Sequence, residues 1–242
     1  VLGLAGIGQL LMTGKLHLPV PALILAGPLY RGHGLFMLIL FASTIALVGP
    51  AWCSHLCYIG AWDGVAAART KPRGKQLTRF WLWGVRSALL AAVLAAALCL
   101  RWAGVSWLPA VLAAALFGLV GVGIMLVVSR RLGLMAHCTV FCPVGLCANL
   151  LGRINPFRVR IGQDCTSCGA CTPTCRYSAL SPEHIEQRAP GLSCTLCGDC
   201  IAACPHRQLD YGLFRLSPAT ARAAFVVLVL SLHAVFLGVA RI

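Results

Sequence analysis

Eight cysteines in the last third of the chain fall into two runs with the same spacing. The runs are "CTSCGACTPTC" and "CTLCGDCIAAC", and each follows the pattern Cys-x2-Cys-x2-Cys-x3-Cys. This spacing is typical of [4Fe–4S] ligation, in which the fourth cysteine of each run reaches the other cluster. Zinc sites need four ligands each and no such triple spacing. The two runs therefore predict two [4Fe–4S] clusters.

The crossed arrangement assigns four cysteines to each cluster. We expect cluster I to be held by Cys165, Cys168, Cys171 and Cys204, and cluster II by Cys194, Cys197, Cys200 and Cys175. Gly169, Ala170 and Gly198 are small enough to let the backbone approach the sulfurs. Arg176 follows the first run where a proline is usual, so the local turn is expected to differ there.

Two further cysteine pairs share the pattern Cys-x3-Cys-x2-Gly. They comprise Cys53 and Cys57, followed by Gly60, and Cys138 and Cys142, followed by Gly145. An i, i+4 spacing places both thiols of a pair on one helix face, and a helix N-terminus favours the thiolate. If the repeat brings both pairs together, four thiols form a third metal site, with iron–sulfur and copper centres both left open. The alternative is that these cysteines are small apolar residues packing a helix end.

The composition indicates a membrane protein. Of the 242 residues, 59% are hydrophobic and only 11% are charged, and the mean hydropathy is +0.85. A soluble domain has about 25% charged residues. We expect about five transmembrane helices, since each apolar stretch approaches the length that crosses a bilayer. The expected spans are residues 1–13, 34–50, 80–103, 109–129 and 222–241.

The net charge of +14 is concentrated in loops between these spans. Basic residues gather at Arg69, Lys71, Arg73, Lys75 and Arg79, and again at Arg130 and Arg131. Their place beside apolar spans favours the positive-inside rule over nucleic-acid binding. This puts both cysteine pairs and residues 153–212 on the cytoplasmic face of a bacterial inner membrane. Fourteen cysteines without a secreted disulfide framework agree with a reducing compartment.

The predicted fold is an all-α polytopic membrane protein with pseudo-repeated helix pairs and a small α+β ferredoxin insert. Three parts are expected: a transmembrane domain at 1–152, a 2[4Fe–4S] domain at 153–212 and a C-terminal transmembrane helix at 213–242. No P-loop, dinucleotide fingerprint or catalytic triad pattern is visible, so no motif in the sequence supports hydride transfer or hydrolysis. No catalytic residue is assigned. The chain begins within an apolar stretch and without methionine, so we expect residues upstream.

The four cysteine motifs together resemble the NapH/NosR group of membrane polyferredoxins. The matching stretches are "WCSHLCYIGAWD", "HCTVFCPVG", "CTSCGACTPTC" and "CTLCGDCIAAC", within residues 14–212. The resemblance implies an electron-transfer subunit of a quinol-linked respiratory oxidoreductase complex. Its partners are the quinone pool, membrane lipid and other redox subunits. Tyr58 stands where the group has proline, and the span at 222–241 is additional.

A second class of function carries similar motifs. CcoG-type assembly factors, which are more distant relatives, are linked to copper handling. That resemblance implies a membrane protein that binds or reduces copper at the Cys-x3-Cys pairs. His233 lies near the middle of the last expected span and is expected to be a packing histidine, with quinone contact or a shared haem as alternatives.

Overall fold

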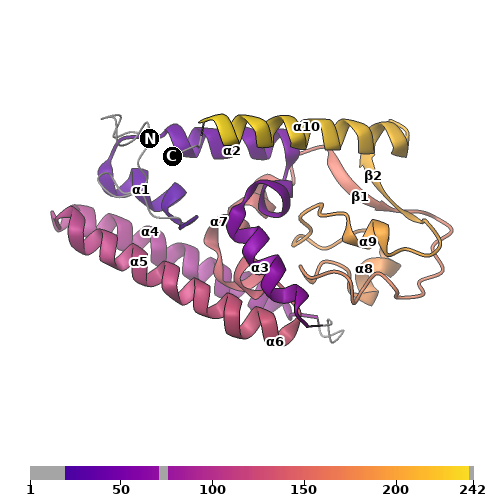
Figure 1. Ribbon diagram of the computed structural model, residues 1–242, viewed down its shortest axis with the longest axis horizontal. Coiled ribbons are helices and arrows are strands. Elements are labelled where there is room, and N and C mark those ends of the chain that lie inside the picture. The colour runs from indigo at the N-terminus through magenta and orange to yellow at the C-terminus, as the bar shows by residue number, and fades with distance from the viewer. Residues whose placement is uncertain (1–19, 71–75, 240–242) are drawn as a thin grey trace.

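The computed structural model describes residues 20–70 and 76–239, with side chains up to residue 235. The span expected at 1–13 lies outside the described residues. Figure 1 shows α2 and α10 side by side along one edge and the α4–α5 hairpin along the other. Helices α3 and α7 lie between these two layers, and the cysteine-rich module occupies one end. The module therefore packs against one end of the helical layers, which we call the helical platform.

The described residues before residue 153 form helices and connecting turns. The α-helices are α1 (Leu23–Arg31), α2 (Phe36–Val48), α3 (Tyr58–Ala68), α4 (Arg86–Trp102), α5 (Trp107–Ile124), α6 (Arg130–Leu132) and α7 (Pro143–Leu151). Among the described residues, four π-helical segments adjoin them: η2 (Trp52–Leu56), η3 (Phe80–Val85), η4 (Met125–Ser129) and η5 (His137–Phe141). Segment η3 runs into α4, and η4 continues α5, so each pair forms one long rod.

Three helices among the described residues are long and apolar enough to cross a membrane. They are Phe80–Trp102, Trp107–Leu132 and Pro218–Val235, which correspond to three of the expected spans. The stretch expected at 34–50 contains only the 13-residue helix α2, which is shorter than the roughly 20 residues a span needs. It ends at Val48, because the next residue, Gly49, has a φ of +64° and leaves the helical region just before Pro50. The expected total of five spans is therefore not confirmed.

The module contains one small sheet and two short helices. Strands β1 (Phe157–Ile161) and β2 (Leu209–Leu213) pair antiparallel, with Phe157 opposite Leu213 and Ile161 opposite Leu209. Helices α8 (Pro182–Glu186) and α9 (Asp199–Ala202) lie in the loops between the strands. Because the strands bracket both cysteine runs, their pairing brings the two ends of the module together.

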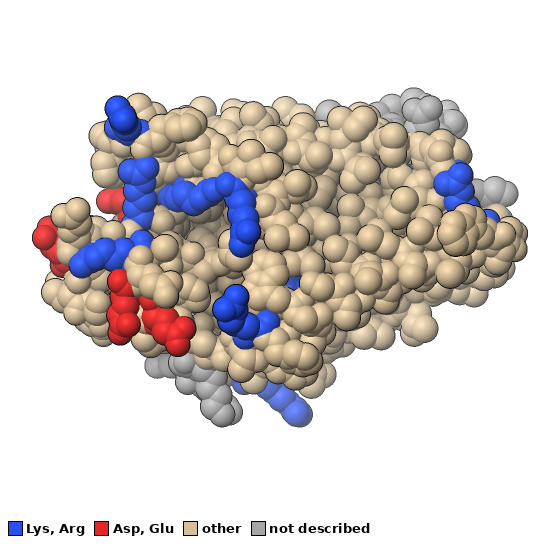
Figure 2. Space-filling model, turned by 180° about the vertical axis from the view of Figure 1, so that it is seen from behind, with Lys and Arg blue, Asp and Glu red and all other residues tan. Residues whose placement is uncertain are grey.

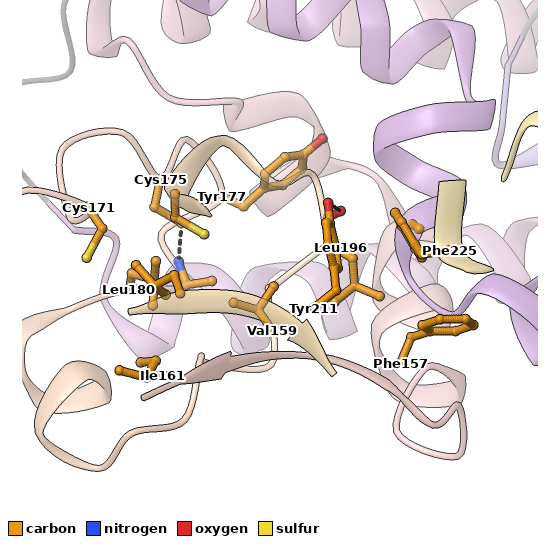
Figure 3. Packing of buried hydrophobic residues seen from close by; sticks show 14 of the residues in the cluster. Phe157, Val159, Ile161, Cys171, Cys175, Tyr177, Leu180, Leu196, Tyr211 and Phe225 are labelled. Carbon is orange, nitrogen blue, oxygen red and sulfur yellow. Dashed lines mark hydrogen bonds between the residues drawn. The ribbon is translucent and has the colours of Figure 1, made fainter. Parts of the chain in front are cut away.

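Helix α10 (Pro218–Val239) packs directly on this sheet. The Phe225 ring stacks on Tyr211 with centroids 4.6 Å apart and meets Phe157 edge-on at 5.4 Å. Figure 3 shows these aromatic rings beside the alternating apolar residues Val159 and Ile161 of β1. Phe225 is only 2% exposed. The last membrane helix is thus joined to the module by an aromatic cluster.

Charged side chains are distributed unevenly between the module and the helical part. In Figure 2 the basic and acidic residues gather mainly around the end that carries the module, and most of the long middle surface is uncharged. Leucines and valines of α5 are exposed, including Leu112, Leu116 and Leu119 at 60% or more. An apolar belt of this kind suits contact with lipid.

We predict that Phe225→Ala loosens the attachment of α10 to the module. Loss of a buried phenylalanine costs about 3 kcal/mol or more because it leaves a cavity, so the melting temperature of the detergent-purified protein should fall. Val227→Ala is the matched control, because Val227 lies on the same helix but is 63% exposed. Equal melting temperatures for the two variants would contradict the packing described.

Candidate functional site

Two small cavities in the module are each lined by one of the expected cysteine sets. One is bordered by Cys165, Cys168, Cys171 and Cys204. The other is bordered by Cys175, Cys194, Cys197 and Cys200. The chain therefore brings the fourth cysteine of each run to the cavity of the other run, as the crossed arrangement requires.

The backbone around the two cavities repeats the same unusual conformations. Ser167 and Leu196 each lie between the first two cysteines of a run, with φ of 54° and 55°. Gly169 and Gly198 follow the second cysteine, with φ of 74° and 87°. Alternation of right- and left-handed conformations turns successive N–H groups toward one side, which favours an anionic guest. These loops therefore fit a negatively charged sulfur-rich group.

Backbone N–H groups also donate to the crossing cysteines. The Ala179 N–H donates to Cys175 Sγ, and the Gln208 N–H donates to Cys204 Sγ, each at 3.3 Å; Figure 3 marks the first of these. Burial raises the pKa of the Cys194 thiol to about 12. A buried thiolate there needs a positive partner, and the irons of a cluster supply one. The donor set of each cavity fits a [4Fe–4S] cluster.

The two Cys-x3-Cys pairs adopt matching folds in the helical part. In each, the second cysteine closes a wide turn: the Cys57 N–H donates to the Trp52 carbonyl at 2.9 Å, and the Cys142 N–H donates to the His137 carbonyl at 2.8 Å. The second cysteine is then extended, with ψ of 115° and 114°. The expectation that each pair lies on one regular helix face is wrong, because the π-helical turn ends at the second cysteine and α3 or α7 begins after it.

The glycine of each motif is required by the first cysteine. A Cβ on Gly60 would overlap the carbonyl oxygen of Cys53, and one on Gly145 would lie 3.1 Å from the carbonyl oxygen of Cys138. Each helix can therefore lie close against its π-helical turn only when glycine occupies this position. This contact accounts for the Cys-x3-Cys-x2-Gly pattern.

The repeat brings the four cysteines of these pairs into one buried region, the paired-cysteine site (Cys53, Cys57, Cys138, Cys142). Cys53 and Cys142 share one apolar cluster, and Cys57 packs against it. Burial and, to a smaller extent, the neighbouring Cys142 raise the pKa of Cys57 to about 12. Cys147 also borders the cluster. No group of three or more Cys, His, Asp or Glu among the described residues is arranged around one metal ion.

Two buried charges beside this site were missed in the sequence. Arg86 of α4 is 1% exposed, and its charge lowers the pKa of Cys53 and Cys142 against the larger effect of burial. The Asp63 Oδ2 of α3 accepts a hydrogen bond from the Cys138 N–H at 3.0 Å and is fully buried. A charged residue within an apolar span is costly and usually functional, which was the available signal for Arg86.

The paired-cysteine site touches the loop of the second module cavity. Ser54 Oγ donates to the Thr195 carbonyl at 2.7 Å, and His55 Nε2 lies 3.3 Å from the Leu196 carbonyl oxygen. Ser54 and His55 lie inside the first cysteine pair, and Thr195 and Leu196 lie between Cys194 and Cys197. The two cysteine-rich regions are thus joined by direct contacts.

Tyr177 lies in the same contact region. It is 4% exposed and interacts electrostatically with Cys138 and Cys53 on one side and with Cys197 on the other. Figure 3 shows its ring directed away from β1 and β2. A buried aromatic side chain therefore occupies the space between the two regions.

Other singled-out residues have simpler surroundings. The Arg176 carbonyl accepts from the Met135 N–H at 3.0 Å, and its guanidinium donates to the Gly64 carbonyl at 3.3 Å. Arg176 thus connects the module to the helical part through its guanidinium. The proline that is usual at this position has no side-chain donor for this contact. His233 is exposed on α10, so the expected packing role is wrong.

Comparisons with known proteins match this chain to iron–sulfur and ferredoxin-type sequences. The family model described as "4Fe-4S binding domain" matches residues 30–75 and 100–162. These segments contain the two Cys-x3-Cys pairs and lie before the two cysteine runs. The methylamine utilization ferredoxin-type protein MauN of Paracoccus denitrificans (strain Pd 1222) is 33% identical over 195 residues. No solved structure gives a significant match.

The match to MauN covers 72% of this chain, and the chain spans 62% of the relative's length. Both matches are to proteins or domains of the 4Fe–4S ferredoxin type. They do not single out the NapH/NosR group.

We predict that Gly60→Ala disrupts the paired-cysteine site. The new methyl group must displace the Cys53 carbonyl, and overpacking of this kind costs about 1–3 kcal/mol. The melting temperature should fall. Gly64→Ala is the control on the same helix, because its Cβ would meet Met135 at an ordinary 3.8 Å. Equal stability of the two variants would contradict the close contact.

Proposed function

We propose that this chain is a membrane-bound electron-transfer subunit that connects the quinone pool with a partner redox protein. The observation that carries the proposal is the direct contact of Ser54 and His55 with the Cys194–Cys197 loop. It places a membrane-side cysteine site next to a ferredoxin-type module, as a chain of redox centres requires. The partner is another subunit of a membrane redox complex.

In this function the module holds two [4Fe–4S] clusters. Cys165, Cys168, Cys171 and Cys204 ligate one cluster, and Cys194, Cys197, Cys200 and Cys175 ligate the other. The clusters supply one-electron redox chemistry. The chain's own part is to bury the sulfurs, donate N–H groups to Cys175 and Cys204, and hold the two cavities side by side. Hydrogen bonds to sulfur and burial are the means by which a protein sets a cluster's potential.

We further propose that the paired-cysteine site holds a third iron–sulfur cluster. The "4Fe-4S binding domain" model matches the segments that carry these cysteines, and Arg86 supplies a nearby positive charge. A cubane separates its thiolates more widely than a single ion does. Among the described residues, Cys53, Cys57, Cys138 and Cys142 are not gathered closely enough to hold one metal ion, which favours a cluster over a copper ion.

The basic residues support a cytoplasmic module. Arg69, Arg79, Arg130 and Arg131 lie at helix ends, and the Leu77 N–H, close to Arg79 in the chain, donates to Ser178 Oγ of the module. By the positive-inside rule, this distribution favours a module in the cytoplasm of a bacterial cell. The printed name of MauN links that relative to methylamine utilization. For this chain we carry over only the ferredoxin-type role.

We predict about twelve iron atoms per chain, with matching acid-labile sulfide, in protein purified without oxygen, since each of three cubanes holds four irons. The double variant Cys53→Ser/Cys57→Ser should retain about eight, because the module's ligands are untouched. The measurement is iron and sulfide analysis with electron paramagnetic resonance of the reduced protein.

The control is Cys99→Ser, because Cys99 is exposed in α4 and far in sequence from every motif. It should leave the iron content unchanged. About eight irons in the unmodified protein would remove the third cluster and leave the two-cluster module. Copper at about one atom per chain, lost in the double variant, would overturn the proposal in favour of metal handling.

A further inference from the structure

A cavity of about 280 Å³ adjoins the paired-cysteine site on its membrane side. It lies between α3, α5 and the second cysteine pair, and its walls are almost wholly apolar. The lining includes Ile59, Trp62, Ala115, Gly118, Phe141 and Cys142. Pockets of roughly 300 Å³ and above, apolar with a few polar groups, are typical of small-molecule and cofactor sites.

His137 lines this cavity with two ring nitrogens that could bind a ligand. Its side chain lines the wall and is 5% exposed. Among the residues the structure describes, neither ring nitrogen makes a full hydrogen bond, and the nearby Gly121 backbone offers only a weak electrostatic interaction. A buried imidazole without a partner is costly. A ligand carrying a hydrogen-bonding oxygen would satisfy it.

The backbone makes room for this ring. A Cβ on Gly121 would lie 3.0 Å from His137 Nδ1 and 2.8 Å from Cε1. Glycine on α5 therefore allows the imidazole to lie between η5 and the helix. Phe141 lies beside the ring at 5.3 Å and stacks on Phe117 at 4.5 Å, which adds aromatic surface to the wall.

The cavity opens toward the lipid-facing surface and ends at a cysteine. Trp62 and Leu119 line it and are 56% and 68% exposed. Cys142, one of the four cysteines of the paired-cysteine site, lines it from within. A molecule dissolved in the bilayer can therefore reach a point next to this site.

We propose that this cavity binds the ring of a quinone or quinol, with a ring oxygen hydrogen-bonded to His137 and the isoprenoid tail leaving past Trp62 and Leu119. The inference rests on the proposed function and adds the location of its membrane substrate. A lipid acyl chain fits the apolar walls but has no atom to bond the imidazole. A flat ring with an oxygen at its edge satisfies both.

The larger apolar cavity nearby lacks this combination. It has a volume of about 330 Å³ and lies between α1, α4 and α5. Its tyrosine, Tyr30, already donates its hydroxyl hydrogen to the Val105 carbonyl at 2.8 Å. It serves as an internal comparison, because Ala114 faces this cavity and its neighbour Ala115 faces the proposed quinone site.

The test is photolabelling of the full chain in lipid nanodiscs with an azidoquinone, competed by decylubiquinone and mapped by peptide mass spectrometry. We expect label on α3 or α5 near the cavity. Ala115→Phe fills the cavity and should reduce the competed label about tenfold or more, whereas Ala114→Phe should leave it within about twofold. His137→Leu should weaken competition by about fivefold to tenfold, the value of one hydrogen bond, and His137→Gln should recover part of it.

Label on α1 or α4 around the larger cavity, or equal labelling of Ala115→Phe and Ala114→Phe, would overturn the assignment. Because labelling does not depend on electron transfer, it tests the cavity separately from the proposed function. Iron-replete protein that fails to label at this cavity disproves the quinone site alone. Protein without iron–sulfur clusters disproves the proposed function, whatever the label shows.

Discussion

Burial of several thiols in one place is the constraint on which the rest of the structure depends. Desolvation raises the pKa of Cys53, Cys57, Cys138 and Cys142. The negative charge of Cys142 raises the pKa of the other three cysteines as well. Such a group is stable as thiolates only with compensating positive charge. The chain supplies Arg86 beside these cysteines, and iron supplies the larger share in the proposed function. The close approach of each turn to its helix, which needs Gly60 and Gly145, follows from gathering the sulfurs at one point.

The second dependence is the attachment of the module to the helical platform. Hydrogen bonds from Ser54 and Arg176, the contact of His55 with Leu196, and the Phe225–Tyr211 stack all cross this boundary. They come from different parts of the chain, so the module is fixed against more than one helix. Fixed spacing matters for electron transfer because the centres must stay near one another, and a covalently continuous chain with several cross-contacts provides it.

The cysteine runs and their crossed grouping were predictable from spacing alone, because residue intervals determine which thiols a short loop can bring together. The long apolar spans at 80–103 and 109–129 were also predictable from length and composition. The π-helical turns were not, since the i, i+4 interval of Cys53 and Cys57 is equally consistent with a regular helix. Asp63 was missed as a site residue because its importance depends on its contact with Cys138. His137 could be placed near the cysteine pairs from the sequence, but the cavity that it lines could not be predicted, because distant segments form it. Helix α2 shows the limit of hydropathy, because Gly49 and Pro50 end it before it reaches spanning length.

The central claim is that electrons pass between membrane and module through the paired-cysteine site. Its most direct test is to reduce the protein in nanodiscs with dithionite, remove the reductant, mix with decylubiquinone and follow reoxidation of the module's clusters by rapid-freeze electron paramagnetic resonance. Each quinone takes up two electrons, from two one-electron oxidations of the reduced clusters, and two protons to become quinol. We expect rapid reoxidation in the unmodified chain. Cys142→Ser, still carrying the module's clusters, should be reoxidised no faster than a sample without quinone. Equally fast reoxidation of both proteins would show that electrons do not pass through the paired-cysteine site.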